Sequence, residues 1–71
     1  MTDWPAHVKG VLRAEMRRRS MSYADLVKAL AKIGVSETEA NLRNKVSRGT
    51  FTAAFLFQCL KAMGVKAIHL D

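Results

Sequence analysis

Side chains able to recognise nucleic-acid bases crowd one short stretch of this 71-residue chain. Asn41 and Asn44 carry amides, which can pair with both N6 and N7 of adenine. Arg43 carries a guanidinium, which can bond O6 and N7 of guanine. Lys45 and Arg48 follow within the same stretch and suit phosphate oxygens. We therefore expect Asn41, Arg43 and Asn44 to contact bases of double-stranded DNA.

The charge balance supports a polyanionic partner. The chain has 12 Lys and Arg against six Asp and Glu, a net charge of +6, and it has no acid between Glu39 and Asp71. Such an excess points to nucleic acid, an acidic protein or an anionic membrane surface. Neutralising about six phosphates would make affinity fall with salt at a log–log slope near −5. The residues expected at phosphates on this ground are Arg17, Arg18, Arg19, Lys45 and Arg48.

Other kinds of chemistry find little support in the sequence. The single cysteine, Cys59, excludes an internal disulfide and any multi-cysteine zinc site. Glu37 and Glu39 are two apart on an expected helix, so they would face different directions rather than form an acid–base pair. There is no Gly-rich phosphate loop before a basic helix. We expect no enzyme activity, no metal and no cofactor.

No apolar run approaches the ~18 residues of a membrane-spanning helix. The first ten residues lack the apolar stretch of a signal peptide. No expected helix combines a large apolar face with basic flanks and bulky aromatics, which a surface-bound helix needs. We therefore expect a cytoplasmic protein with no membrane partner.

Helix caps and apolar periodicity predict an all-α fold, a compact four-helix domain that occupies residues 1–71. The expected N-caps are Asp3, Ser22 (with Asp25 bonding back), Ser36 in an S-x-x-E box, and Thr52. A short extended C-terminal segment follows, packed on the bundle or shared as a strand with a second copy. The expected helices are 4–19, 23–33, 37–47 and 53–63.

The apolar residues repeat at helical spacing and indicate which side of each helix is buried. Cys59 shares the apolar face of the last helix and is expected to be buried, whereas Phe57 points away from that face. In the third helix only Leu42 and Val46 are strongly apolar. The first helix has the stripe Trp4, Val8, Val11, Leu12 and Met16, and the second has Leu26, Val27, Leu30 and Ile33.

The second and third helices, joined through Gly34, have the sequence form of a helix-turn-helix. A short connection makes the two helices cross steeply and places 37–47 across the front of the domain. With Leu42 and Val46 turned inward, Arg43 and Lys45 flank the opposite side. That side holds Glu37, Ala40, Asn41, Asn44, Ser47 and Arg48.

The segments 22–26, 34–36, 45–49 and 52–64 together resemble the lambda-repressor-like (Xre-type) helix-turn-helix domains. The stretch NLRNKVSRGTF at 41–51, with YADL at 23–26 and FLFQCL at 55–60, resembles a family of small bacterial proteins of unknown function. The repressor resemblance implies DNA binding. It implies that Asn41 and Asn44 meet bases, and that phosphates are met by Ser22, Tyr23, Lys45, Arg48 and Thr50.

Two features depart from the repressor pattern. Gly34 and Gly49 are 15 positions apart, about one helical turn longer than usual, and Glu37 and Glu39 place negative charge at the tip of the third helix. Binding of RNA or single strands is disfavoured, because few aromatic side chains lie outside the expected core to stack on bases. The sequence therefore leaves two main functions open. The first is a DNA-binding module, a small transcriptional regulator that binds as a homodimer because one helix reads few base pairs. The alternative is a protein-interaction or antitoxin-like module with an acidic protein partner, suggested by those glutamates and by Phe51 and Phe57.

Overall fold

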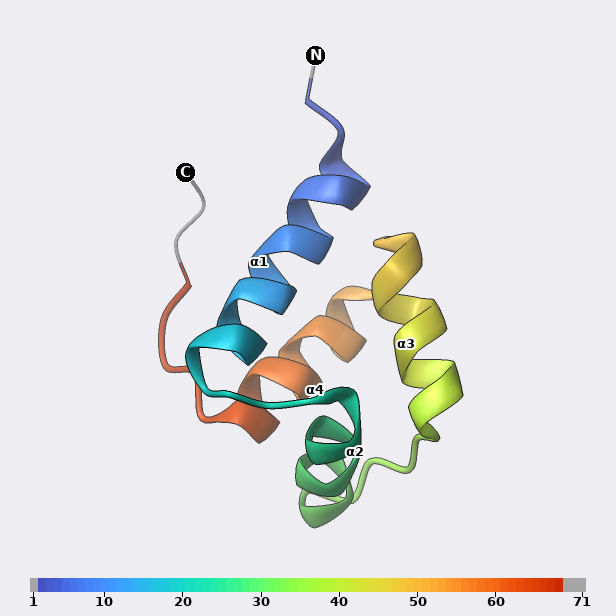
Figure 1. Ribbon diagram of the computed structural model, residues 1–71, viewed down its shortest axis with the longest axis vertical. Helices are drawn as coiled ribbons and strands as arrows, with labels where there is room; N and C mark the ends of the chain where they lie inside the picture. Colours follow the sequence, from blue (N-terminus) through green and yellow to red (C-terminus); the bar gives the residue numbers. More distant parts are fainter. Residues whose placement is uncertain (1, 69–71) are drawn as a thin grey trace.

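The computed structural model describes residues 2–68, and in this range the chain forms four helices and no strand. The all-α fold class is confirmed. In Figure 1, α1 and α4 cross the middle of the molecule, α3 lies on the right, and α2 lies at the bottom. The helices are α1 (Trp4–Arg18), α2 (Tyr23–Lys32), α3 (Glu39–Arg48) and α4 (Ala53–Met63).

Three of the four expected N-caps are confirmed. Asp3 accepts from the Ala6 N–H, Ser22 and Asp25 form a reciprocal capping box, and Thr52 accepts from the Phe55 N–H. The helices α1 and α2 each end one residue earlier than expected, and α4 has the expected bounds.

The start of α3 corrects the expectation of a helix over 37–47 capped by Ser36. Thr38 is the N-cap, with its hydroxyl oxygen 3.1 Å from the Asn41 N–H that donates to it. The helix therefore begins two residues later and runs to Arg48. Because Glu37 lies before the helix, its carboxylate is free to turn inward, and its Oε2 lies 2.5 Å from the Nζ of Lys45.

The core lies where the four helices meet, and Cys59 is fully buried in it as expected. Burial, with Glu37 nearby, raises the pKa of the Cys59 thiol to about 12, so this thiol stays protonated at neutral pH. The core residues are Leu12, Met16, Leu26, Leu30, Leu42, Val46, Phe55, Cys59, Leu60 and Met63.

Two residues of the expected apolar stripes lie on the surface, and two others, Val8 and Val11, are only half-buried. Trp4 is 64% exposed and Ile33 is 42% exposed. Trp4 is the first residue of α1, and its ring lies edge-on against His7 of the same helix rather than in the core. Ile33 follows the last residue of α2, where the helical repeat no longer holds the side chain over the core.

The structure describes the first part of the C-terminal segment. Residues 65–68 contain no helix or strand, and Val65 and Ile68 are half-buried against the core. This agrees with a short segment packed on the bundle. The end of the expected segment, His69 and Leu70, lies outside the described residues.

Gly49 ends α3 in direct contact with the start of α1. Its φ is +68°, in the left-handed region that favours glycine. A Cβ at this position would lie 2.1 Å from the backbone oxygen of Pro5 and 2.7 Å from its carbonyl carbon. The contact therefore requires the absence of a side chain as well as the left-handed backbone, and it fixes how closely α3 approaches α1.

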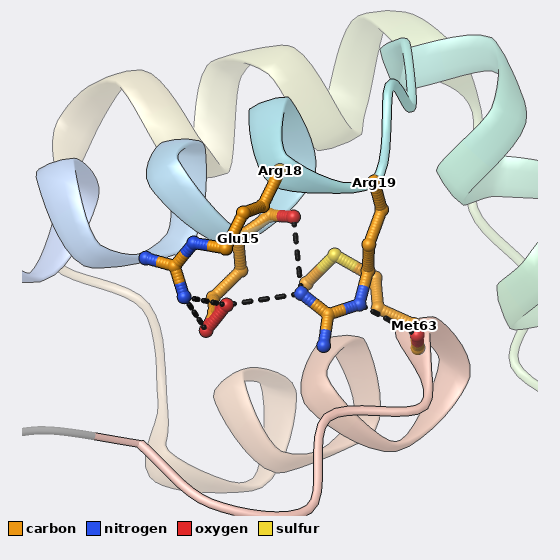
Figure 2. A network of polar contacts seen from close by, with 4 residues as sticks. All are labelled: Glu15, Arg18, Arg19 and Met63. Atoms are coloured by element: carbon orange, nitrogen blue, oxygen red, sulfur yellow. Dashed lines mark hydrogen bonds and ion pairs between the residues drawn. The ribbon is translucent and has the colours of Figure 1, made fainter.

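A polar network joins the C-terminal ends of α1 and α4 (Figure 2). The Glu15 carboxylate is almost fully buried and accepts from the guanidinium groups of Arg18, at 2.8 Å, and Arg19, at 3.0 Å. Arg19 also donates to the Met63 carbonyl oxygen at 3.1 Å. The Arg19–Met63 bond connects the two helix ends, and the Glu15 carboxylate, which needs such partners when buried, holds the Arg19 guanidinium in place for it.

The Gly49 contact predicts unequal costs for alanine at two left-handed glycines. Gly64 has a similar φ of +77° but open space around its Cα. Gly64→Ala should therefore lose only the left-handed preference, about 1–2 kcal/mol. Gly49→Ala should lower the free energy of unfolding by about 1–3 kcal/mol more, because the backbone of Pro5 must move. Urea denaturation measures both, and equal losses would contradict the contact.

The Glu15 network predicts a larger loss than an exposed ion pair. Glu15→Ala should lower the free energy of unfolding by about 2 kcal/mol, because it removes charge-assisted hydrogen bonds from a buried site. Glu39→Ala, which breaks a pair whose side chains are about half exposed, should cost under about 1 kcal/mol. Thermal unfolding of the two variants compares them. Similar losses would show that the network holds the helices no better than a surface pair does.

Candidate nucleic-acid interface

The outer side of α3 presents polar side chains to solvent, as expected from the helical repeat. Leu42 and Val46 are fully buried on the inner side. We call the exposed outer residues the α3 face: Ala40, Asn41, Asn44, Ser47 and Arg48. The two amides and the guanidinium of this face are therefore available to a ligand.

Glu37 does not belong to the α3 face, which corrects the expectation that it would. Its side chain is only 9% exposed and it binds Lys45. The Lys45 Nζ also lies 4.8 Å from the centre of the Phe55 ring, a cation–π distance. Lys45 is therefore held between α3 and α4 by a carboxylate and an aromatic ring, and its charge is largely neutralised within the domain.

Beside the α3 face lies a basic crevice of about 400 Å³ where α1, α2 and α3 meet. The Nε of Arg13 donates to the Tyr23 hydroxyl at 3.3 Å. The guanidinium carbon of Arg43 lies 5.4 Å from the centre of the same ring. We call this site the arginine crevice. Its lining residues are Arg13, Met16, Arg17, Met21, Ser22, Tyr23, Glu39 and Arg43.

One carboxylate occupies the arginine crevice. The Glu39 Oε1 accepts from the Arg43 guanidinium at 2.8 Å, and the two side chains are 49% and 55% exposed. Such a solvent-exposed pair is held by less than about 1 kcal/mol. A phosphate oxygen can therefore replace this carboxylate on Arg43.

The start of α2 forms one wall of the crevice. Ser22 accepts from the Asp25 N–H at 3.1 Å, and the Asp25 carboxylate accepts from the Ser22 N–H at 2.9 Å. The backbone and hydroxyl bonds of Ser22 lower the pKa of Asp25, so this carboxylate is charged at neutral pH. The Ser22 hydroxyl carries one rotatable proton, which can turn from Asp25 to an anion that enters the crevice.

The three arginines at 17–19 separate in the structure, because successive helical residues point about 100° apart. Arg17 lines the arginine crevice, whereas Arg18 and Arg19 bind Glu15 near the end of α4 (Figure 2). The structure thus brings Arg17, Ser22, Tyr23 and Arg43 together and places Arg18 and Arg19 away from them.

The remaining candidates lie at the end of α3. Arg48 is exposed in the last turn, and Thr50 is exposed directly after Gly49. The Lys9 ammonium of α1 donates to the Ser47 carbonyl oxygen at 3.2 Å, where the negative end of the helix dipole favours a cation. This end of α3 is therefore also basic.

Sequence reasoning missed Arg13 and the pairing of Glu39. The sequence contains a spacing that could have indicated both. Arg13 and Arg17 are four residues apart, as are Glu39 and Arg43, and residues at this spacing share one side of a helix. What the sequence could not supply was the packing of α1 against α3, which places the two pairs at one crevice.

Other kinds of site are not found in the described part of the chain. Residues 2–68 contain no group of three His, Cys, Asp or Glu side chains that could hold a metal ion. Within the same range, no helix is both long and apolar enough to cross a membrane.

Comparison with known proteins places the chain in a family. Neither the curated proteins nor the solved structures contain a match to it. A family model described as a domain of unknown function, DUF6471, matches residues 4–68, which includes all four helices. The chain therefore belongs to the DUF6471 family.

Proposed function

We propose that this domain binds double-stranded DNA as a small transcriptional regulator, with α3 in the major groove. The observation that carries the proposal is the continuity of the α3 face with the arginine crevice. Arg43 belongs to α3 and lines the crevice, and Asn44 is its neighbour on the exposed side. A single approach of a duplex therefore meets base-reading amides and phosphate-binding arginines together.

The α3 face supplies the base contacts in this proposal. Asn41 and Asn44 are exposed one helical turn apart, so both can reach base edges along the groove. An asparagine side chain matches the N6 and N7 pattern of adenine. Arg43 lies at the border of the face and reaches either a guanine or a phosphate, because its only ion pair within residues 2–68 is the exposed one with Glu39.

The arginine crevice supplies the backbone contacts. Arg13 and Arg17 lie on α1, beside the hydroxyls of Ser22 and Tyr23 at the start of α2. The N-terminal end of a helix favours an anion, and these hydroxyls can donate to phosphate oxygens. A phosphate in this crevice fixes the position of α3 in the groove without contributing to sequence recognition.

The structure lowers the number of phosphates that the domain is expected to neutralise. Lys45 is bound to Glu37, and Arg18 and Arg19 are bound to Glu15. Four phosphate contacts per domain correspond to a log–log salt slope of about −3.5, shallower than the −5 expected from the sequence. The arginines left to supply them are Arg13, Arg17, Arg43 and Arg48.

Two domains are expected to act together. One recognition helix reads only a few base pairs, so domains of this kind bind two half-sites about one helical turn apart. We propose a homodimer on a two-fold symmetric operator, acting in the cytoplasm.

Two neighbouring arginines provide a matched test. Arg17→Ala should weaken binding of a short duplex about tenfold and make the salt slope shallower by about one. Arg18→Ala removes the same charge, but the Arg18 side chain pairs with Glu15. The affinity for the duplex and the salt slope should therefore stay close to those of the parent chain. Fluorescence anisotropy at two salt concentrations measures both quantities.

Three outcomes would contradict the proposal in this experiment. They are no binding by the parent chain at low salt, binding that does not depend on salt, and equal losses from the two variants. Circular dichroism of each variant checks that the helices remain formed.

The carboxylate in the arginine crevice gives a second test. Glu39→Gln should raise the affinity for duplex DNA by about threefold to tenfold, because it removes a negative charge and releases Arg43 for phosphate. In a chain that also carries Arg43→Ala, the same change should have a much smaller effect, since no guanidinium is left to release. This double-mutant cycle isolates the pair. An equal gain in both backgrounds would show that Glu39 acts only through net charge.

A further inference from the structure

The last helix and the segment after it form a groove that is separate from the DNA-facing side. Its volume is about 280 Å³. In Figure 1 the segment after α4 lies on the left of the molecule and α3 lies on the right, with α1 and α4 between them. We call this site the C-terminal groove. It is lined by Phe57, Leu60, Lys61, Val65, Lys66, Ala67 and Ile68.

The groove is marked by an aromatic side chain that the core does not use. Phe57 is 66% exposed, although Phe55, Cys59 and Met63 on the inner side of the same helix are buried. An exposed phenyl ring beside half-buried Val65 and other apolar side chains forms a surface that gains free energy when a partner covers it. The apolar part of the groove is therefore suited to receive a large apolar side chain.

The rim of the groove is positively charged. Lys61 and Lys66 are exposed, and no lining residue is acidic. Within residues 2–68, neither lysine forms an ion pair. In the same range, no backbone hydrogen bond ties residues 66–68 to another segment, so an incoming peptide can also bond to their N–H and C=O groups.

The charges favour one occupant over another. In a two-fold dimer formed through this groove, the same surface of each copy would face the other. Lys61 and Lys66 would then approach their own counterparts between two chains of net charge +6, which is repulsive. A second copy is therefore a poor fit, whereas carboxylates on a partner match both lysines.

We propose that the C-terminal groove binds an acidic peptide segment of a partner protein. One large apolar side chain of the segment packs on Phe57 and Leu60, and flanking carboxylates pair with Lys61 and Lys66. Since this site lies away from α3, the domain can hold DNA and the partner segment at the same time.

The test uses the full chain labelled with ¹⁵N and a short amidated peptide that alternates Asp and Glu with Leu and Phe. Amide resonances from residue 57 to residue 68 should shift and saturate, while those of α3 stay in place. Phe57→Ser should weaken binding at least about 30-fold, as expected for a buried aromatic anchor. Lys61→Glu with Lys66→Glu should weaken it about tenfold or more.

The controls match each change elsewhere on the surface. Trp4→Ser removes an aromatic side chain of similar exposure, and Lys28→Glu with Lys32→Glu reverses two exposed lysines on α2. Both should leave peptide affinity unchanged, as Phe57→Ser should leave duplex binding unchanged. A peptide with Lys in place of Asp and Glu should not bind.

Three results would overturn the proposal. The first is no saturable shift with the acidic peptide. The second is an equal loss from Trp4→Ser and Phe57→Ser. The third is a parent chain that sediments as a dimer and becomes a monomer with Phe57→Ser. That result would show that a second copy of the chain, not an acidic peptide, occupies the groove.

Discussion

The close approach of Gly49 to Pro5 sets the position of the third helix. The helix α3 buries only Leu42 and Val46 fully, a thin apolar stripe for a segment that must hold a fixed orientation. At the C-terminal end of α3, the backbone of Gly49 contacts the backbone of Pro5 with no Cβ between them. The two helices therefore approach more closely there than side-chain packing allows. The arginines of the arginine crevice come from these same two helices, so the crevice depends on the packing of α3 against α1.

The basic side chains of this domain divide into two groups by their partners. Arg18, Arg19 and Lys45 pair with carboxylates that are largely buried, and these carboxylates lie within the domain's own fold. Others are exposed, such as Arg17 at the arginine crevice and Arg48 on the α3 face. The net charge of +6 therefore overstates the positive charge available to a polyanion, and it does not indicate which surface carries that charge. The two glutamates near the tip of α3 are both paired within the domain, Glu37 with Lys45 and Glu39 with Arg43.

The sequence was a good guide to the elements because caps and apolar repeats are local signals. Ser22 with Asp25, and Thr52, begin helices where expected, and the fold class is confirmed. The error at α3 arose because Ser36 and Thr38 are both good caps within three positions, and only packing chooses between them. Trp4 was misplaced because a helical stripe does not tell where the neighbouring helices end.

The candidate site was harder to predict than the fold. The polar face of α3 followed from the helical repeat alone, as the exposure of Asn41 and Asn44 shows. The arginine crevice did not, because it joins residues from three helices. The helical repeat separates Arg17 from Arg18, but the pairing of Arg18 and Arg19 with Glu15 also depends on the burial of that carboxylate. Nothing in the sequence distinguishes a buried glutamate from an exposed one.

Amide chemical-shift mapping with a short DNA duplex at low salt tests the central claim most directly. Our account predicts that the resonances of Asn41, Asn44 and Arg48 shift together with those of Arg17 and Tyr23, while those of the C-terminal groove remain in place. No shift, or shifts confined to the C-terminal groove, would contradict it.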